Sequence, residues 1–322
     1  MRRVLIGLAA VVFGVTSLTA QTKAPKTVRR AQPPPPAKLR SDLFYADAFK
    51  EGLVGERPAD LGKAAAGSVG NAVSGVPSAS SAPGSASPAR GGWSGLISAA
   101  TIEDTIKSLK QQVDKDVTTL SDFKGKGHKL ARRDYTLLAM LFGIAGEYDG
   151  EVRWKKDAPV ARDAFGRSAA NFKVATDQAF NEAKARKEEL NELVSGSSPF
   201  AGKSADAKAP WGQVADRAPL MQYLESAWEP RLKPALSDKG QFMTGGDKVL
   251  RDAELFAAIG FVLAKEGMKD AGDAEYQAFC NRLRDASKQI IDAVKQKDFD
   301  SASKAGSTIG KACTECHENY RS

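Results

Sequence analysis

The stretch CTECHENYR, residues 313–321, lies near the end of this 322-residue sequence and carries its most specific motif. Within it, Cys313, Cys316 and His317 have the Cys-x-x-Cys-His spacing by which a c-type haem is attached. The two thiols can add to the vinyl groups of the haem, and the histidine directly after the second thiol can bind the iron through a ring nitrogen. The motif therefore predicts one covalent haem c, with His317 as its proximal iron ligand.

Three other roles for this motif have less support from the sequence. A thioredoxin-like Cys-x-x-Cys opens a helix after a strand, and no strand-like run precedes it here. A zinc site needs about four ligands, but the chain has only three cysteines and two histidines, and Cys280 and His128 lie far from the motif in sequence. A disulfide between the two motif cysteines would leave His317 without a role. We expect Cys280 to be a buried free thiol and His128 a surface residue.

The full pattern Cys-x-x-Cys-His-x-x-Tyr-Arg, at the end of a predicted helix, resembles the class II cytochromes c, the family of cytochrome c′ and c556. In that family, the haem motif lies at the end of the fourth helix of a four-helix bundle. The resemblance covers residues 211–322 and implies two further site residues. Arg321 would lie near the proximal side of the haem, where its charge would favour a haem propionate or tune the basicity of His317. Tyr320 would pack on the haem edge or on the end of the bundle.

The distal iron ligand is the part of the site that the resemblance leaves open. In the low-spin members of the family, the first helix carries Arg-x-x-x-Met, and RAPLM, residues 217–221, matches this pattern. Met221 is therefore the candidate sixth ligand, and its thioether would stabilise ferrous iron and raise the potential, as suits an electron carrier. Methionine is also a common core residue. If Leu220 or Leu224 faces the iron instead, the site would resemble that of the gas-binding members.

The chain from Trp93 onward is predicted to be helical. In residues 273–297, apolar residues recur at three- and four-residue steps, which indicates one face of a helix. Residues 248–265 carry a broader apolar face, suited to the interior of a bundle, and Met243 falls in a predicted turn before them. Asp298 is the expected N-cap of a last helix. The inner face of that helix has mainly small residues, which leaves room for a flat haem.

An internal repeat divides this helical region into two parts. Trp93 and Trp211 are 118 residues apart, since 211 − 93 = 118. The same ungapped offset relates the Arg-Asp pair at residues 133–134 to the Arg-Asp pair at residues 251–252. Similarity at a fixed offset indicates duplicated units.

The first repeat lacks the haem residues. The offset of 118 places SGSSP, residues 195–199, where the second repeat has CTECH, and it places Glu103 where the second repeat has Met221. The sequence therefore predicts an all-α protein of two tandem four-helix bundles. These are a haem-less bundle over residues 93–210 and a cytochrome c′-like haem bundle over residues 211–322.

The N-terminal region predicts export. A basic region (residues 1–3), an apolar core (residues 4–15) and small residues before Gln21 are typical of a secretory signal peptide over residues 1–20. The apolar core is too short to cross a bilayer comfortably. An uncleaved anchor stays an alternative, because Leu18 is not the ideal residue three before the cut. Since haem c is assembled on the outer side of the bacterial cytoplasmic membrane, the signal and the haem motif predict the same compartment, the periplasm.

Residues 21–92 are rich in Pro, Ala, Ser and Gly. Such a segment cannot bury enough apolar surface to offset its ordering entropy, so we expect a disordered linker. Its stretch 43–49 is apolar enough to form a short helix or docking element. The chain has a net charge of +8, with a basic excess in the linker. We expect membrane contact only through an uncleaved signal or this tail, and no binding of nucleic acid, because no basic stripe is interleaved with aromatic residues.

These features together predict an exported monohaem c-type cytochrome that transfers single electrons between redox protein partners in the periplasm. Two alternatives stay open: an NO- or CO-binding protein of the cytochrome c′ type for gas scavenging or sensing, and a haem-bearing interaction module of a larger respiratory complex. Family bundles often form homodimers through their early helices, although the first repeat could occupy that surface internally. Nothing in the sequence indicates hydrolytic or transferase catalysis, so we do not expect an enzyme.

Overall fold

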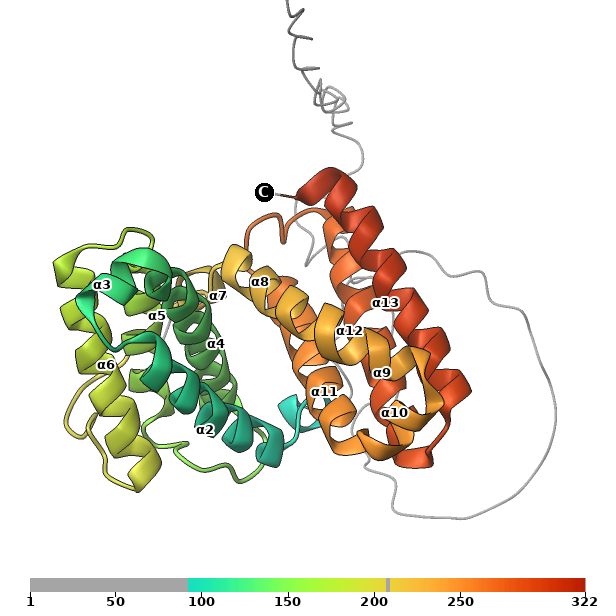
Figure 1. Cartoon of the computed structure of the whole chain (residues 1–322), viewed down its shortest axis with the longest axis horizontal. Coiled ribbons are helices and arrows are strands. Elements are labelled where there is room, and N and C mark those ends of the chain that lie inside the picture. Colours follow the sequence, from blue (N-terminus) through green and yellow to red (C-terminus); the bar gives the residue numbers. More distant parts are fainter. Residues whose placement is uncertain (1–91, 207–208, 322) are drawn as a thin grey trace, which may run out of the picture. The chain divides into compact units, whose positions relative to one another are not determined.

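The computed structural model describes residues 92–206 and 209–321. The predicted signal peptide, and all but the last residue of the predicted linker, lie outside these ranges. The described residues belong to one compact unit. They form helices joined by short connections, with no β-strand among them, so the predicted all-α class is confirmed for this part of the chain (Figure 1). None of the helices in the described ranges is long and apolar enough to cross a membrane.

The helices fall into two sets along the chain, which we call the first half (residues 92–206) and the second half (residues 209–321). The first half contains η2 (Trp93–Gly95), α2 (Ala99–Asp116), α3 (Leu120–Asp122), η3 (Phe123–Gly127), α4 (His128–Glu147), α5 (Ala158–Asn171) and α6 (Asp177–Ser195). The second half contains α7 (Trp211–Val214), α8 (Arg217–Ala227), η4 (Trp228–Leu232), α9 (Lys233–Ser237), α10 (Lys239–Thr244), α11 (Gly246–Leu263), α12 (Ala274–Gln296) and α13 (Phe299–Tyr320).

Several helix ends have a local cause in the sequence. The carboxylate of Asp273 accepts hydrogen bonds from the first backbone N–H groups of α12, and Asp298 accepts one from Ser301 at the start of α13. The predicted N-cap of the last helix is therefore confirmed. The helix α12 ends where Lys297 adopts a left-handed conformation, with φ of 56°. Met243, in contrast, lies within the short helix α10 and not in a turn, so that prediction was wrong.

The helix starts repeat along the chain. Three elements of the second half begin 118 residues after their counterparts in the first half: α7 after η2 (211 − 93), α8 after α2 (217 − 99) and α11 after α4 (246 − 128). The later pairs keep the order with a small drift, since α12 begins 116 residues after α5 and α13 begins 122 residues after α6. The order and spacing of the long helices in the two halves are therefore alike.

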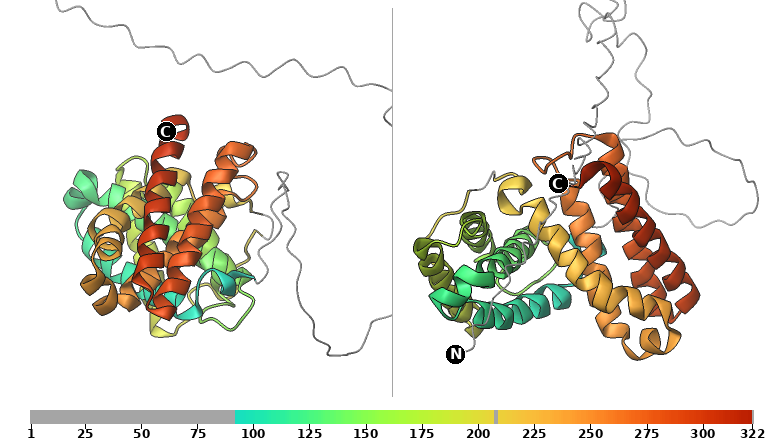
Figure 2. Two further views of the ribbon diagram at one scale, coloured as in Figure 1. Left: turned by 90° about the vertical axis from the view of Figure 1, so that its right-hand side faces the viewer. Right: turned by 45° about the horizontal axis from the view of Figure 1, so that its top comes forward.

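The second half is built around the antiparallel helices α11, α12 and α13, which lie side by side (Figure 2). The inner face of α13 consists of small residues and one isoleucine, all of them buried: Ala302, Ala305, Gly306, Ile309 and Ala312. A Cβ atom at Gly306 would lie 2.8 Å from Cδ1 of Leu236, so glycine lets α9 approach α13 closely. The helix α8 packs on α11 and, in the first half, on α4.

The two halves also contact each other through aromatic residues. The ring centroids of Trp93 and Trp211 are 5.7 Å apart, and Trp93 also contacts Phe261 of α11 at 5.1 Å. The carboxylate of Glu254 on α11 accepts hydrogen bonds from the backbone N–H and the hydroxyl of Ser98, at 3.2 and 2.8 Å. These contacts join the start of α2 to α11 and form part of a shared interior.

Candidate functional site

One cavity of about 550 Å³ opens in the second half of the molecule. Residues of α8, η4, α11, α12 and α13 form most of its wall. All six residues that the sequence predicted for the site line this cavity: Met221, Cys313, Cys316, His317, Tyr320 and Arg321. A volume of this order is typical of sites for small organic ligands and cofactors. The structure therefore brings the predicted residues together around a space of cofactor size.

The last two turns of α13 present the motif to this cavity. Cys313, Cys316, His317 and Tyr320 follow each other at steps of three, one and three residues, so they lie on one side of the helix. The thiols of Cys313 and Cys316 are free and partly buried. Burial raises the pKa of Cys313 to about 11 and also raises that of Cys316. Both sulfurs therefore carry a proton at neutral pH, and the S–H group is the one that adds across a vinyl bond.

The helix α8 forms a second wall. Arg217 and Met221 are one helical turn apart, and both line the cavity. The Arg217 side chain is only 5% exposed and donates a hydrogen bond to Asp270 at 2.7 Å. Its guanidinium also lies 5.4 Å from the ring centre of Tyr276. A charged group this deep in the protein is held by its partners, and it gives the cavity a cationic edge.

The helix α12 forms a third wall that is mostly aromatic. Tyr276 and Phe279 contact the ring of Tyr320, with centroids 5.2 and 6.2 Å apart. The Tyr320 hydroxyl donates to the carboxylate of Glu275 at 3.3 Å, which fixes the last turn of α13 against the start of α12. The Tyr276 hydroxyl is buried and makes no hydrogen bond to any described residue. Burial raises the pKa of Tyr276 far above its ordinary value, so the group is a neutral donor.

The residues around the cavity fit a haem. Two thiols and one imidazole supply the atoms for covalent attachment and iron ligation, while Leu224, Phe256 and Leu263 give an apolar surface for a flat macrocycle. The buried hydroxyl of Tyr276 has no hydrogen-bond partner among the described residues, and a ligand with a polar edge would satisfy it. The described residues hold no group of three or more His, Cys, Asp or Glu side chains that could bind a free metal ion.

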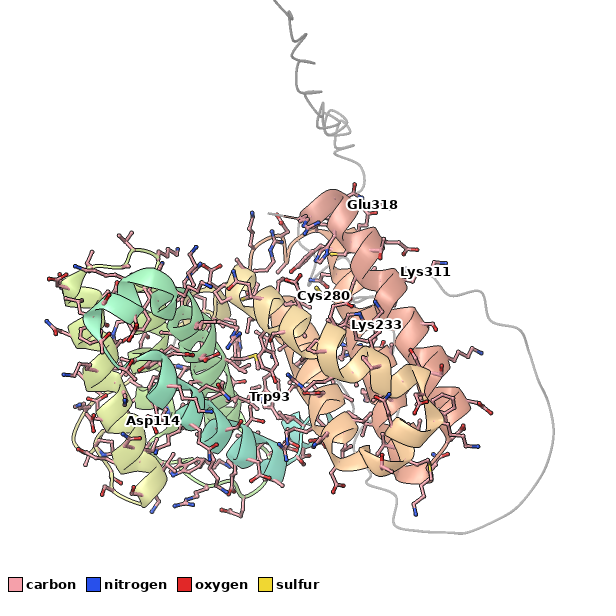
Figure 3. The ribbon with its side chains drawn as sticks, viewed as in Figure 1. Trp93, Asp114, Lys233, Cys280, Lys311 and Glu318 are labelled. Atoms are coloured by element: carbon pink, nitrogen blue, oxygen red, sulfur yellow. The ribbon has the colours of Figure 1, made fainter. Side chains whose placement is uncertain are left out.

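The structure separates the remaining histidine and cysteine of the sequence. His128 is not part of the cavity wall; it begins α4, where its Nδ1 lies 3.1 Å from the carbonyl oxygen of Phe123. Cys280, labelled in Figure 3, is a buried free thiol, as predicted. It also lines the same cavity as Cys313 and Cys316, which the sequence interpretation missed. Its spacing of four residues from Tyr276 on α12 is the one signal in the sequence that places the two side chains on a shared helix face.

In the first half, residues of the connection between α4 and α5 contact α2 and α6 near the positions equivalent to the cavity of the second half. The segment 148–157 joins α4 to α5, and the indole of Trp154 within it donates to the carbonyl oxygen of Leu193 near the end of α6, at 2.8 Å. The Arg153 backbone N–H donates to Glu103, the position equivalent to Met221, and its guanidinium donates to the carbonyl oxygen of Val194. These two residues thus bridge Glu103, the repeat equivalent of Met221, and the end of α6, just before residues 195–199, the repeat equivalents of the Cys-x-x-Cys-His motif.

Comparisons with known proteins do not extend this description, because no protein-family model, no curated protein and no solved structure matches the chain.

Proposed function

We propose that the protein is an exported monohaem c-type cytochrome that carries single electrons. The observation that supports this most is that Cys313, Cys316 and His317 line a cavity of about 550 Å³ together with Met221. A Cys-x-x-Cys-His sequence that arose by chance on a helix would be expected to face solvent or a filled core. Here it borders a cavity with a mostly apolar lining, which is what covalent attachment of a flat cofactor requires.

Each residue has a distinct part in this proposal. The sulfurs of Cys313 and Cys316 would hold the haem covalently, and a ring nitrogen of His317 would bind its iron. Leu224, Phe256 and the other apolar wall residues keep water from the buried face of the haem. The bound haem would supply one-electron chemistry at its iron, and the protein supplies burial, ligands and an exposed edge for redox partners.

We also propose the finer architecture that the repeat predicts, a haem-less bundle followed by a haem bundle. Its support is the offset of 118 residues between the starts of α2 and α8 and between those of α4 and α11. The first bundle has no motif cysteine, histidine or methionine at the corresponding positions, which hold Glu103, Ser195, Ser198 and Pro199 instead. In this proposal, the first bundle supports the second and holds no cofactor of its own.

The proposed compartment is the periplasm, and its support comes from the sequence of residues 1–20 and from the site at which haem c is assembled. Fractionation of the cells that make the protein, followed by haem staining, tests this part. Haem-stained protein found only in the cytoplasmic fraction would contradict it.

A second function, binding of NO or CO, has support from one observation. Leu224 and Phe256 line the cavity beside Met221, and an apolar residue next to the iron is what the gas-binding members of the resembled family have. The distal ligand decides between the two functions. The third alternative, a docking module of a larger respiratory complex, would show itself as co-purifying subunits.

The test of the proposed function is the haem itself. The purified protein should keep its haem stain after denaturation, and a pyridine haemochrome assay should give one haem per chain. The double variant Cys313→Ala, Cys316→Ala should lose the stain, whereas Cys280→Ser, which changes the third cysteine of the same cavity, should keep it. A wild-type protein without covalent haem, produced in a host that matures other c-type cytochromes, would overturn the proposal. Two haems per chain would overturn the haem-less first bundle.

A further inference from the structure

Three thiols line one cavity, and the proposed haem attachment uses only two of them. Cys280 lies on α12, whereas Cys313 and Cys316 lie on α13, and all three are free. Cys280 is buried, with 4% of its surface exposed, whereas Cys316 is partly accessible. The third thiol, that of Cys280, has no part in the proposed haem attachment and could react with another cysteine.

Two side-chain contacts fix the register of α12 against α13. Tyr276 contacts Tyr320, with ring centroids 5.2 Å apart, and Arg282 donates to Glu315 at 2.5 Å. As the residue number rises on α12 it falls on α13, so the two helices are antiparallel (Figure 2). Cys280 comes four residues after Tyr276, and Cys316 comes four residues before Tyr320. These two cysteines are therefore at the same level across the interface.

The electrostatics agree with this register. Burial raises the pKa of Cys280 to about 12, and the nearness of Cys316 adds to that rise. Cys313 lies about one helical turn before Cys316 on α13. The register therefore places Cys316, and not Cys313, level with Cys280.

We propose that, in the haem-free chain, Cys280 and Cys316 can close a disulfide bond, and that this bond prevents haem attachment. Formation of the Cys280–Cys316 disulfide is argued from the geometry of α12 and α13 alone. Its effect on haem attachment rests on the proposed function. A disulfide needs the Cα atoms of its two cysteines within roughly 7 Å of each other. Two residues that face each other at the same level of packed antiparallel helices can meet this limit.

The chemistry needs a disulfide donor, such as oxidised glutathione or the disulfide of an oxidoreductase. The thiolate of Cys316, the more accessible of the two, attacks one donor sulfur; the donor bond breaks, a mixed disulfide forms, and one donor thiol leaves. The Cys280 thiol then gives up its proton and attacks the sulfur of Cys316, which releases the second donor thiol. Two protein thiols are oxidised, one donor disulfide is reduced, and two protons pass from the protein to the donor thiols.

The consequence for maturation follows from the atoms involved. A thioether forms when an S–H group adds across a vinyl bond, and a sulfur in a disulfide has no hydrogen to add. Cys316 would therefore be unable to react until a reductant restores its thiol. Oxidising compartments favour such bonds, so in the proposed periplasmic location the haem-free chain would depend on a thiol reductant before it could receive haem.

The experiment uses the full chain produced without haem, with circular dichroism to confirm that it is helical. Cys313→Ser leaves Cys280 and Cys316 as the only thiols, and Cys316→Ser, the matched control, leaves Cys280 and Cys313. After incubation with oxidised glutathione, free thiols are counted and the protein is digested without reduction. Trypsin cuts after Lys269, Arg282 and Lys311, and a glutamate-specific protease cuts after Glu315, so each of the three cysteines falls on its own peptide.

The expected result is a peptide that joins Cys280 to Cys316, both in Cys313→Ser and in the wild-type chain, with a fall from two free thiols to none in the variant. The control Cys316→Ser should keep two thiols. A wild-type chain that forms only the bond between Cys313 and Cys316, or a control that oxidises as readily as Cys313→Ser, would overturn the proposed pairing.

The proposed effect of the disulfide on haem attachment is tested by attaching haem in vitro to the oxidised wild-type chain. Attachment should fall to background and return when dithiothreitol is added before the haem. Equal attachment with and without the Cys280–Cys316 bond would overturn the competition. If the fully reduced chain also attaches no haem, the proposed function fails and the competition fails with it, whereas the peptide map still decides the disulfide.

Discussion

Met221 is the residue on which the choice between the two candidate functions depends. It lies in the cavity wall on α8, partly buried and packed against the core, one helical turn after the buried Arg217. A thioether sulfur is a soft ligand that prefers ferrous iron. Its position in the wall suits ligation, but the same position suits ordinary packing in a core that is rich in leucine. Spectroscopy separates the two roles.

The first prediction concerns this side chain. If Met221 binds the iron, the wild-type protein should be six-coordinate and low-spin in both oxidation states and should bind CO slowly, because the thioether must leave first. Met221→Ala should shift the iron toward high spin, speed CO binding and lower the potential. Visible spectra, stopped-flow CO binding and a redox titration measure these effects. The control is Met243→Ala, which changes a methionine that is 47% exposed on α10 and should alter none of them. A wild-type protein that is already five-coordinate and binds CO at once would favour the gas-binding function.

A second informative pair of residues lies where the halves meet. Asp134 on α4 and Asp252 on α11 are equivalent positions of the repeat, yet their partners differ. Arg231 donates to both carboxylate oxygens of Asp252, at 3.0 and 2.9 Å. Arg133 donates to one oxygen of Asp134 at 2.7 Å, and the other oxygen is buried without a hydrogen bond. Burial therefore outweighs the ion pair and raises the pKa of Asp134 above its ordinary value of 3.8.

The second prediction follows from that pKa. A carboxyl group whose folded-state pKa is raised contributes stability that is fully present below pH 3.8 and is lost as the pH rises through the folded-state value. Asp134→Asn carries no charge, so its melting temperature relative to wild type should rise between pH 3 and pH 7. The gain at neutral pH should be about 1 kcal/mol, the order of the cost of a buried unpaired acceptor.

Asp252→Asn is the matched control for this pH dependence. It breaks a pair in which both oxygens are bonded to Arg231, so it should destabilise the protein at neutral pH. Differential scanning calorimetry at several pH values measures both variants. A melting temperature of Asp134→Asn that falls relative to wild type as the pH rises would contradict the argument.

At the scale of elements, the connection of α4 to α5 is the segment that distinguishes the two halves. Trp154 is largely buried in it, with φ of 63°, a left-handed conformation that a bulky residue seldom adopts. Its indole is held by the hydrogen bond to the carbonyl oxygen of Leu193, by an edge contact with Phe142 and by the guanidinium of Arg153 at 4.9 Å. These contacts offset the strain and hold the segment against α4 and α6.

The third prediction is that Trp154 and its contacts, which we call the Trp154 plug, stabilise the fold. Trp154→Ala should cost about 3 kcal/mol, because it removes a large buried side chain that the segment cannot replace. Trp154→Phe keeps a ring but loses the hydrogen bond to α6, and it should cost about 1 kcal/mol. Thermal denaturation followed by circular dichroism measures both. Haem content should not change in either variant. A variant that gained a second haem, or that melted like wild type, would contradict the proposed stabilising role of Trp154.

The sequence predicts the long helices of the second half well and the cavity only in part. The apolar spacing of residues 273–297 and the cap at Asp298 are local signals, and the structure has α12 and α13 there. The motif residues are also recognisable from spacing alone. The role of Cys280 in the wall is not, because it depends on the register of α12 against α13. The plug at Trp154 lies in a mainly polar segment without periodicity, so no local pattern predicts its burial.

At the scale of the whole molecule, the two halves contact each other in a reciprocal way. Trp93 of the first half packs on Phe261 of α11 at 5.1 Å. Trp211 of the second half packs on Gly143 of α4, where an added Cβ atom would lie 3.0 Å from its ring. Phe261 is the repeat equivalent of Gly143, since 261 − 143 = 118. Each tryptophan thus contacts the same position of the other half, as in a two-fold symmetric dimer.

The starts of the first helices repeat this reciprocity. Ser98, which precedes α2, donates to Glu254 on α11, and its equivalent Asp216, which precedes α8, pairs with Arg132 on α4 at 2.5 Å. In both cases the residue that precedes one half's first long helix, α2 or α8, bonds to the other half's second long helix, α11 or α4. These faces are therefore used within one chain. The homodimer that the family resemblance implies would need a different surface.

The fourth prediction tests whether this reciprocal contact makes the halves one cooperative unit. Trp93→Ala removes the ring that Trp211 and Phe261 contact, together with a 3.0 Å hydrogen bond to Glu147, and it should cost about 3 kcal/mol. Because the two rings touch, the effects of Trp93→Ala and Trp211→Ala should not add. A double-mutant cycle should give a coupling of about 1 kcal/mol.

Calorimetry gives the second readout for this contact. The wild-type chain should unfold in one transition, because each half buries part of the other. With both tryptophans replaced, the transition should separate into two, and the haem absorbance should change in only one of them, since the haem is proposed to lie in the second half. The conservative variant Trp93→Phe, which retains the ring packing, should keep the single transition. Additive effects, or two transitions already in the wild-type chain, would show that the halves are independent domains that happen to touch.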